Sequence, residues 1–215
     1  MRKFEFGHRV RITLMSLFGA IAMAAAGLAQ AVPITYTISG LETGRVSVGF
    51  SQSNFSNQLV TMTLTGDTSG FNAGSFGPGS VDLISGTVAV AGFGVGIIDF
   101  ASSPMVFYAG PNNQGSGTAG FGVFPNGNSF DIISPFFQTY DGISNAGPVV
   151  GTNHPFSFFG AQIFTSIGRI QIRDPGAPTT LTFSARVPEP SSLGLVTAAL
   201  LGFATTARRS RPTRR

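Results

Sequence analysis

The chain contains no cysteine and no tryptophan, and only 10% of its 215 residues are charged. The missing thiols exclude disulfide bonds, thiol catalysis and cysteine metal sites. Only two histidines occur, and His8 lies in the basic N-terminal segment. A Ser-His-Asp triad would therefore have to use His154, but no serine lies in a Gly-x-Ser-x-Gly turn between a strand and a helix. A loop histidine before Pro155 is the simpler interpretation.

Carboxylates are also few in the middle of the chain. Residues 32–187 hold one glutamate, Glu42, and six scattered aspartates, which offers no evident pair for glycoside hydrolysis. Asp67 and Asp141 adjoin glycine in predicted turns, where aspartate commonly bonds its own backbone. The alternative is calcium, although neither group has the spacing of a calcium loop; its candidate oxygen ligands are Asp67 with Thr68, and Asp141 with Ser144 and Asn145. We expect no catalytic residue, no cofactor and no metal site.

The N-terminus has the features of an export signal. Four basic residues lie among the first eleven, residues 12–29 are apolar, and Ala29-Gln30-Ala31 supplies small side chains at a cleavage site. This pattern predicts a secretory signal peptide over residues 1–31 that is cut after Ala31. The apolar run is long, so an uncleaved anchor is the alternative.

Basic residues are concentrated at the two ends of the chain. The whole chain is +4 with an isoelectric point near 10.3. Residues 32–187 instead carry four arginines against seven acidic residues, a net charge of −3. This segment has no basic patch for phosphate, so we expect no nucleic-acid partner.

The C-terminus combines three blocks in sequence. Val187-Pro188-Glu189-Pro190 is stiff and extended, because each proline fixes its own φ and keeps the preceding residue out of the helical region. Residues 191–207 are uncharged and apolar, just long enough for a transmembrane helix. An arginine cluster over 208–215 would stay in the cytoplasm; it comprises Arg208, Arg209, Arg211, Arg214 and Arg215.

Residues 187–215 resemble the PEP-CTERM sorting signal of exopolysaccharide-producing Gram-negative bacteria. The resemblance implies recognition by a membrane sorting enzyme, an exosortase, with transient insertion of residues 191–207 in the inner membrane. It further implies cleavage near the motif and delivery to the cell surface or extracellular matrix. A plain C-terminal membrane anchor is the alternative.

Residues 32–186 are expected to form one exported β domain. Apolar and polar residues alternate with a period of two over 34–39, 45–51, 60–65, 169–173 and 180–187, which is typical of half-buried strands. We expect the first strand to end at Gly40 and residues 141–154 to be mostly turn and loop. The fold class predicted is mainly β: an antiparallel β-sandwich, with a jelly roll as one form, flanked by an N-terminal signal helix and a C-terminal single transmembrane helix. A solenoid is the alternative, but no repeat of fixed period is evident.

Three functions remain open for this domain. Its seventeen phenylalanines favour a packed core over an aromatic sugar platform, which usually uses Trp or Tyr. The first hypothesis is a non-enzymatic surface or matrix protein associated with exopolysaccharide. The second is a carbohydrate- or ice-binding module that uses the threonine-rich face around Thr61, Thr63 and Thr65. An enzyme is the weakest of the three.

Overall fold

The computed structural model describes residues 32–70, 79–111, 116–123, 128–153, 162–173 and 178–188. Residues Val32–Pro188 form one compact unit, which excludes both ends of the chain. Its elements are β1 (Pro33–Val48), β2 (Ser51–Asp67), the 3-10 turn η1 (Thr68–Gly70), β3 (Ser80–Val90), β4 (Gly94–Ile97), β5 (Met105–Pro111), β6 (Gly117–Val123), β7 (Asn128–Ser134), the 3-10 turn η2 (Pro135–Gln138), β8 (Ala146–Asn153), β9 (Ile163–Thr165), β10 (Gly168–Arg173) and β11 (Thr180–Arg186).

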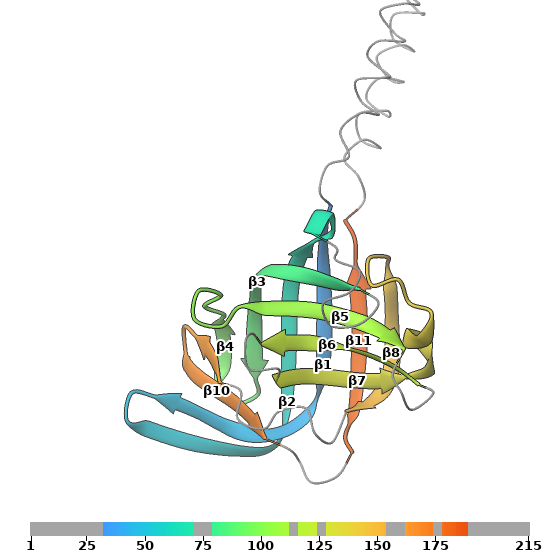
Figure 1. Ribbon diagram of the computed structural model, residues 1–215. Coiled ribbons are helices and arrows are strands. Elements are labelled where there is room, and N and C mark those ends of the chain that lie inside the picture. Colours follow the sequence, from blue (N-terminus) through green and yellow to red (C-terminus); the bar gives the residue numbers. More distant parts are fainter. Residues whose placement is uncertain are drawn as a thin grey trace, which may run out of the picture. The chain divides into compact units, whose positions relative to one another are not determined.

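Eight of these strands close into an antiparallel barrel, so the predicted β-sandwich or jelly roll is wrong. The strands follow the order β11-β8-β7-β6-β5-β3-β2-β1, and β1 pairs again with β11 (Figure 1). That closing register runs from Thr35 opposite Arg186 to Gly40 opposite Leu181. Period-two alternation says only that each strand has one buried face. It cannot separate two packed sheets from one sheet that closes on itself.

The helices predicted at the two ends of the chain are not found among the described residues, where the only helical elements are the 3-10 turns η1 and η2. The expected signal helix in residues 1–31 and the expected transmembrane helix at 191–207 both lie outside the described ranges. No helix within these ranges has the length and apolar character needed to cross a membrane.

The barrel interior is aromatic, as the phenylalanine content predicted. Tyr36 on β1 stacks on Phe107 of β5 with ring centroids 3.7 Å apart. Phe183 of β11 lies 5.8 Å from Phe107 and meets Phe137 of η2 edge-on at 5.1 Å. All four rings are buried. Because they come from β1, β5, β11 and η2, this cluster joins opposite sides of the barrel wall, and burying each such side chain contributes about 1.5–3 kcal/mol.

Gly40 does not end β1. A Cβ at this position would overlap the side chain of Leu181 and lie 2.8 Å from the carbonyl oxygen of Thr180. The glycine is therefore required because β11 crosses close to β1, and the strand continues through it to Val48. Two separate strands were predicted here, and the structure has one.

A second ring of strands adjoins the barrel. The outer part of β1 pairs with β10, which pairs with β9. Backbone N–H groups of Asp99 and Ser166 donate to the carbonyls of Phe164 and Ile97 at 2.9 Å each, and these bonds join β9 to the end of β4. The ring β1-β10-β9-β4-β3-β2 thus shares three strands with the barrel. The buried residues on this ring include Val46, Phe55, Ile98, Ile163, Ile170 and Ile172, which belong to the same hydrophobic cluster as the barrel interior.

The long β1–β2 hairpin extends beyond the barrel as an arm, which we define as residues 43–58. β1 is bounded there by β10 on one edge and β2 on the other. Gly49 makes the turn with a φ of 56°, in the left-handed region where glycine is tolerated without strain. Figure 1 shows the arm projecting past β10. The chain thereby places a two-stranded extension at one side of a closed fold.

Candidate functional site

The outer surface of β1 and β2 carries paired hydroxyl groups. Inward positions such as Ile38 and Met62 are fully buried, so the intervening threonines and serines point outward. The register sets Thr35 opposite Thr65 and Thr37 opposite Thr63. Their Oγ1 atoms lie 3.2 Å and 3.4 Å apart, respectively. The two strands therefore hold their hydroxyls in hydrogen-bonded cross-strand pairs.

The same pattern continues onto the neighbouring strands. Thr63 lies opposite Thr87 of β3, and Thr37 lies opposite Ser184 of β11. The row of Ser184, Thr37, Thr63 and Thr87 crosses four adjacent strands, about 4.8 Å apart, and rows along a strand are about 6.7 Å apart. The two flanking rows each have hydroxyls on three strands, because Arg186 lies opposite Thr35 and Ala89 lies opposite Thr61. We call these positions the hydroxyl face; they are Thr35, Thr37, Ser39, Thr61, Thr63, Thr65, Ser85, Thr87, Thr182 and Ser184.

The hydroxyl face is electrically neutral and has a mixed rim. The charged side chains of Asp67 and Arg186 lie at the end where β1 begins, opposite Pro33 and Thr35. At the other end and along the sides the rim is aliphatic and exposed, formed by Leu41, Leu59, Val95, Ile97 and Val150. Each threonine offers a hydroxyl, which both donates and accepts, beside a methyl group. Such a surface can bind a neutral ligand with repeated hydroxyls but supplies no acid, base or charged nucleophile.

The sequence singled out only one strand of this face. Thr61, Thr63 and Thr65 were the predicted candidates, and they lie at its centre. Their partners on β1, β3 and β11 were not identified as a site, because neighbouring strands and their register are set by tertiary structure. The available signal was the recurrence of threonine or serine at every second position of four separate runs.

The predicted sorting motif begins where β11 ends. The backbone N–H of Val187 donates to Oδ1 of Asn145 at 2.7 Å, and its side chain packs against the core. Pro188 is the last described residue. Glu189, Pro190, the cleavage residues Ala29 and Ala31, the arginine cluster and His154 all lie outside the described ranges.

The two ends of the compact unit leave the barrel side by side. Both the backbone N–H and the hydroxyl of Thr68 donate to the carbonyl of Val32, at 3.3 Å and 3.0 Å. Thr35 lies opposite Arg186 in the adjacent strand. Val32 and Val187 therefore lie at the same end of the barrel, the end away from the tip of the arm.

The two candidate calcium groups cap turns. Oδ1 of Asp67 accepts the backbone N–H of Ser69 at 2.8 Å. Oδ1 of Asp141 accepts the N–H groups of Ile143 and Ser144 at 3.0 Å each and the Ser144 hydroxyl at 2.8 Å. Burial alone would raise the pKa of Asp141, but these hydrogen bonds together outweigh it and lower the pKa. Among the described residues, no three His, Cys, Asp or Glu side chains gather as metal ligands would.

The Asp141 turn is fixed to the barrel interior by two tyrosines. The hydroxyl of Tyr36 donates to the carbonyl of Gly142 at 2.7 Å, and that of Tyr140 donates to the carbonyl of Ser144 at 2.7 Å. Burial is the main cause that raises the pKa of both tyrosines; at Tyr36 the neighbouring Tyr140 and then the Asp141 carboxylate add to it, and at Tyr140 the Asp141 carboxylate does. These residues serve the packing of one turn.

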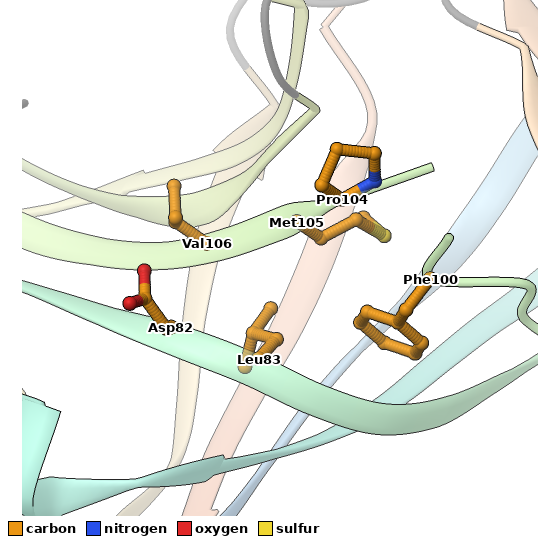
Figure 2. A pocket seen from close by; sticks show the side chains of 6 residues that line it. All are labelled: Asp82, Leu83, Phe100, Pro104, Met105 and Val106. Atoms are coloured by element: carbon orange, nitrogen blue, oxygen red, sulfur yellow. The ribbon is translucent and has the colours of Figure 1, made fainter. Parts of the chain in front are cut away.

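A small pocket lies between β3 and β5. Its volume is about 370 Å³, and one carboxylate, Asp82, faces an otherwise apolar lining. Figure 2 shows the Leu83, Phe100 and Met105 side chains around this space, with Asp82 beside Val106. A single carboxylate without a second acid or a histidine does not form an acid–base pair. The pocket is therefore an apolar space with one carboxylate. The hydroxyl face is the more extensive candidate for a binding site.

Comparison with known proteins assigns this chain to no family. No protein-family model matches the chain, and no curated protein or solved structure matches it.

Proposed function

We propose that this chain is an exported, non-enzymatic protein of the cell surface or extracellular matrix, sorted through its C-terminal Pro-Glu-Pro signal. The support for sorting is the ordered succession of Val187-Pro188-Glu189-Pro190, the apolar segment 191–207 and the arginine cluster of 208–215. An exosortase-type enzyme is the partner that this tail implies. The inner membrane holds the chain transiently before cleavage.

The shared exit point of the two chain ends suits this role. Val32 and Val187 lie at one end of the barrel, since Pro33 pairs with Asp67 and Thr35 with Arg186. The tail that is processed therefore begins at the end of the barrel away from the tip of the arm.

The hydroxyl face is the observation that carries the activity we propose, which is binding to a neutral polysaccharide. Ten threonine and serine side chains on four adjacent strands offer repeated hydrogen-bond donors and acceptors for the hydroxyls of a glycan chain. The centre of the face carries no charge, and Arg186 and Asp67 lie only at one end of it, which favours a neutral glycan over an anionic one. Ice is the other regular hydroxyl lattice that such a face could bind.

Sorting is tested by replacing Pro188-Glu189-Pro190 with three alanines in the producing organism. We expect the variant to stay in the inner-membrane fraction, whereas the parent chain reaches the surface. A matched control replaces Ser191 and Ser192 by alanine, which leaves the motif intact. If the triple variant arrives at the surface in normal amounts, the tail is an ordinary anchor and the proposed sorting is wrong.

Binding is tested with the full-length chain and the double variant Thr37→Val/Thr63→Val. Valine keeps the shape and the methyl groups but removes the two hydroxyls that lie 3.4 Å apart. Loss of two ligand hydrogen bonds, each about 0.5–1.5 kcal/mol, corresponds to a roughly 5- to 150-fold loss in affinity. Microcrystalline cellulose and the organism's own exopolysaccharide are the neutral probes, and alginate is the anionic probe.

The matched control is Thr139→Val, an exposed threonine after η2 and away from the face. It should bind as the parent does. Equal binding by the double variant would remove the hydroxyl face from the proposal, and binding to alginate alone would contradict the neutral-glycan assignment. Shaping of ice crystals without retention on any glycan would assign the face to ice instead.

A further inference from the structure

The arm leaves one strand edge unpaired. Over Ser51–Gln58, β2 pairs with β1, whereas β3 joins β2 only from Val60 onward. No other described strand lies along this part of β2. Figure 1 shows the arm with β10 and β1 on one side and no strand beyond β2. The backbone N–H and C=O groups that point away from β1 therefore pair with no strand of the described ranges.

This edge has neither of the side-chain features that usually block strand pairing. Natural edge strands are protected by charges, especially lysine, by proline or by β-bulges. Residues 51–58 read Ser-Gln-Ser-Asn-Phe-Ser-Asn-Gln, with no charge and no proline. All except the buried Phe55 and the half-buried Gln58 are exposed. A local irregularity at Asn57, with φ of 53°, is the one interruption of an otherwise regular edge.

We propose that the arm is a self-association site, at which β2 of one copy pairs antiparallel with β2 of a second copy. A two-fold axis would then pass through the segment 51–57 and give a continuous sheet β1-β2-β2-β1 across the two copies. An isologous pair places each side chain near its own counterpart, so a charged edge would repel itself. Serine, asparagine and glutamine instead hydrogen-bond to their own kind.

The lack of charge on this edge favours a second copy of the chain as the partner over an acidic or basic protein. Arg45 is the one charged residue of the arm, and it lies on β1, where its guanidinium donates to Gln52 at 3.3 Å. The edge of β2 itself therefore offers no charge for a partner to complement. Its specificity comes from backbone pairing and from uncharged polar side chains. This association does not rest on polysaccharide binding, since the hydroxyl face begins beyond the arm.

Cysteine scanning tests the pairing directly, because the chain has no cysteine of its own. Single cysteines are placed in turn at Gln52, Ser53, Asn54 and Ser56 of the full-length chain, which is then oxidised with copper phenanthroline. Opposed residues of an antiparallel pair lie about 4.5–5.5 Å apart, within the range of a disulfide. We expect covalent dimer to peak sharply at the one position nearest the two-fold axis.

Ala101→Cys, an exposed turn position outside the arm, is the matched control for random collision. The expected yield at the peak is at least fivefold above this control. Equal yields at every position, or none above the control, would overturn the proposal.

A charge variant gives an independent readout without oxidation. Gln52→Lys/Asn54→Lys places like charges across the proposed axis, and Ala101→Lys/Thr139→Lys adds the same charge elsewhere. Sedimentation equilibrium should show the edge variant to dimerise at least tenfold more weakly than the control variant. Circular dichroism and thermal melting confirm that both variants fold. A monomeric parent chain at all concentrations, or equal dimerisation of the two variants, would exclude the arm as the site.

Discussion

Replacing Gly40 by alanine tests the closure between β1 and β11. The added Cβ would overlap the Leu181 side chain and lie 2.8 Å from the Thr180 carbonyl oxygen. A flexible side chain can move aside, but the backbone oxygen is fixed by the strand pairing around it. Overpacking of this kind costs about 1–3 kcal/mol. Alanine also lowers the conformational entropy of the unfolded chain, which stabilises the folded state by roughly 0.4–1 kcal/mol.

The net expectation is a loss of roughly 0.5–2 kcal/mol, which lowers the melting temperature by roughly 2–6 °C in a domain of this size. Gly122→Ala is the matched control, because a Cβ there meets Val106 at an ordinary 3.5 Å. That variant gains the entropic term without strain, so its melting temperature should rise by about 1–3 °C. The two alanine variants of the full-length chain should therefore shift in opposite directions.

Thermal melting monitored by circular dichroism measures both shifts in melting temperature. If Gly40→Ala is as stable as Gly122→Ala, then β1 and β11 do not pack edge to edge, and the barrel is not closed. The comparison therefore tests the β1–β11 pairing with a single methyl group at each position.

Phe183→Ala should destabilise the chain by about 3–5 kcal/mol, because it removes a fully buried ring that contacts Phe107, Phe137 and Tyr140; urea unfolding measures this, and a loss below 1 kcal/mol would contradict the aromatic core. The raised pKa values of Tyr36 and Tyr140 mean that the folded state holds their protons more tightly than the unfolded state. The contribution of the two tyrosines to stability should be constant below the ordinary tyrosine pKa of 10.0 and fall as pH rises above it, by up to about 1.4 kcal/mol per pH unit for each tyrosine; unfolding curves whose midpoint is the same at pH 9 and pH 11 would contradict this. Isoelectric focusing of the surface form should give an acidic value, since residues 32–189 carry four arginines against eight acidic residues, and focusing above about pH 9 would mean that the arginine tail is retained.

Local strand content could be predicted from the sequence. Alternation over 34–38, 60–65 and 180–187 placed segments of β1, β2 and β11, and the same alternation marked which residues are buried. These signals are local, because a strand with one face in the core repeats every second residue whatever its neighbours are. The sequence predicted mostly turn and loop over residues 141–154, which is wrong for β8 (Ala146–Asn153). Pairing with β7 and β11 on its two sides makes it a strand.

The hydroxyl face shows why the site could be predicted only in part. Thr61, Thr63 and Thr65 on β2 stood out as a polar stripe, and their outward direction followed from the buried Met62 and Leu64 between them. Their assembly into a four-strand surface depends on which strands adjoin β2 and on a register that sets threonine opposite threonine. A shift of one residue would have turned these side chains to the core.

What the sequence by itself determined is the nature of each piece: basic and apolar ends, a cysteine-free acidic middle, alternating strands and a core of phenylalanine. What only the tertiary structure decided is how the pieces join, namely the barrel closure from Thr35 to Gly40, the second ring through β9 and β10, and the free edge of the arm. The physical reason is the range of the interactions. Alternation and turn preference act between neighbours in the chain, whereas closure and register depend on backbone pairs such as Ile38 with Phe183, which are far apart in sequence.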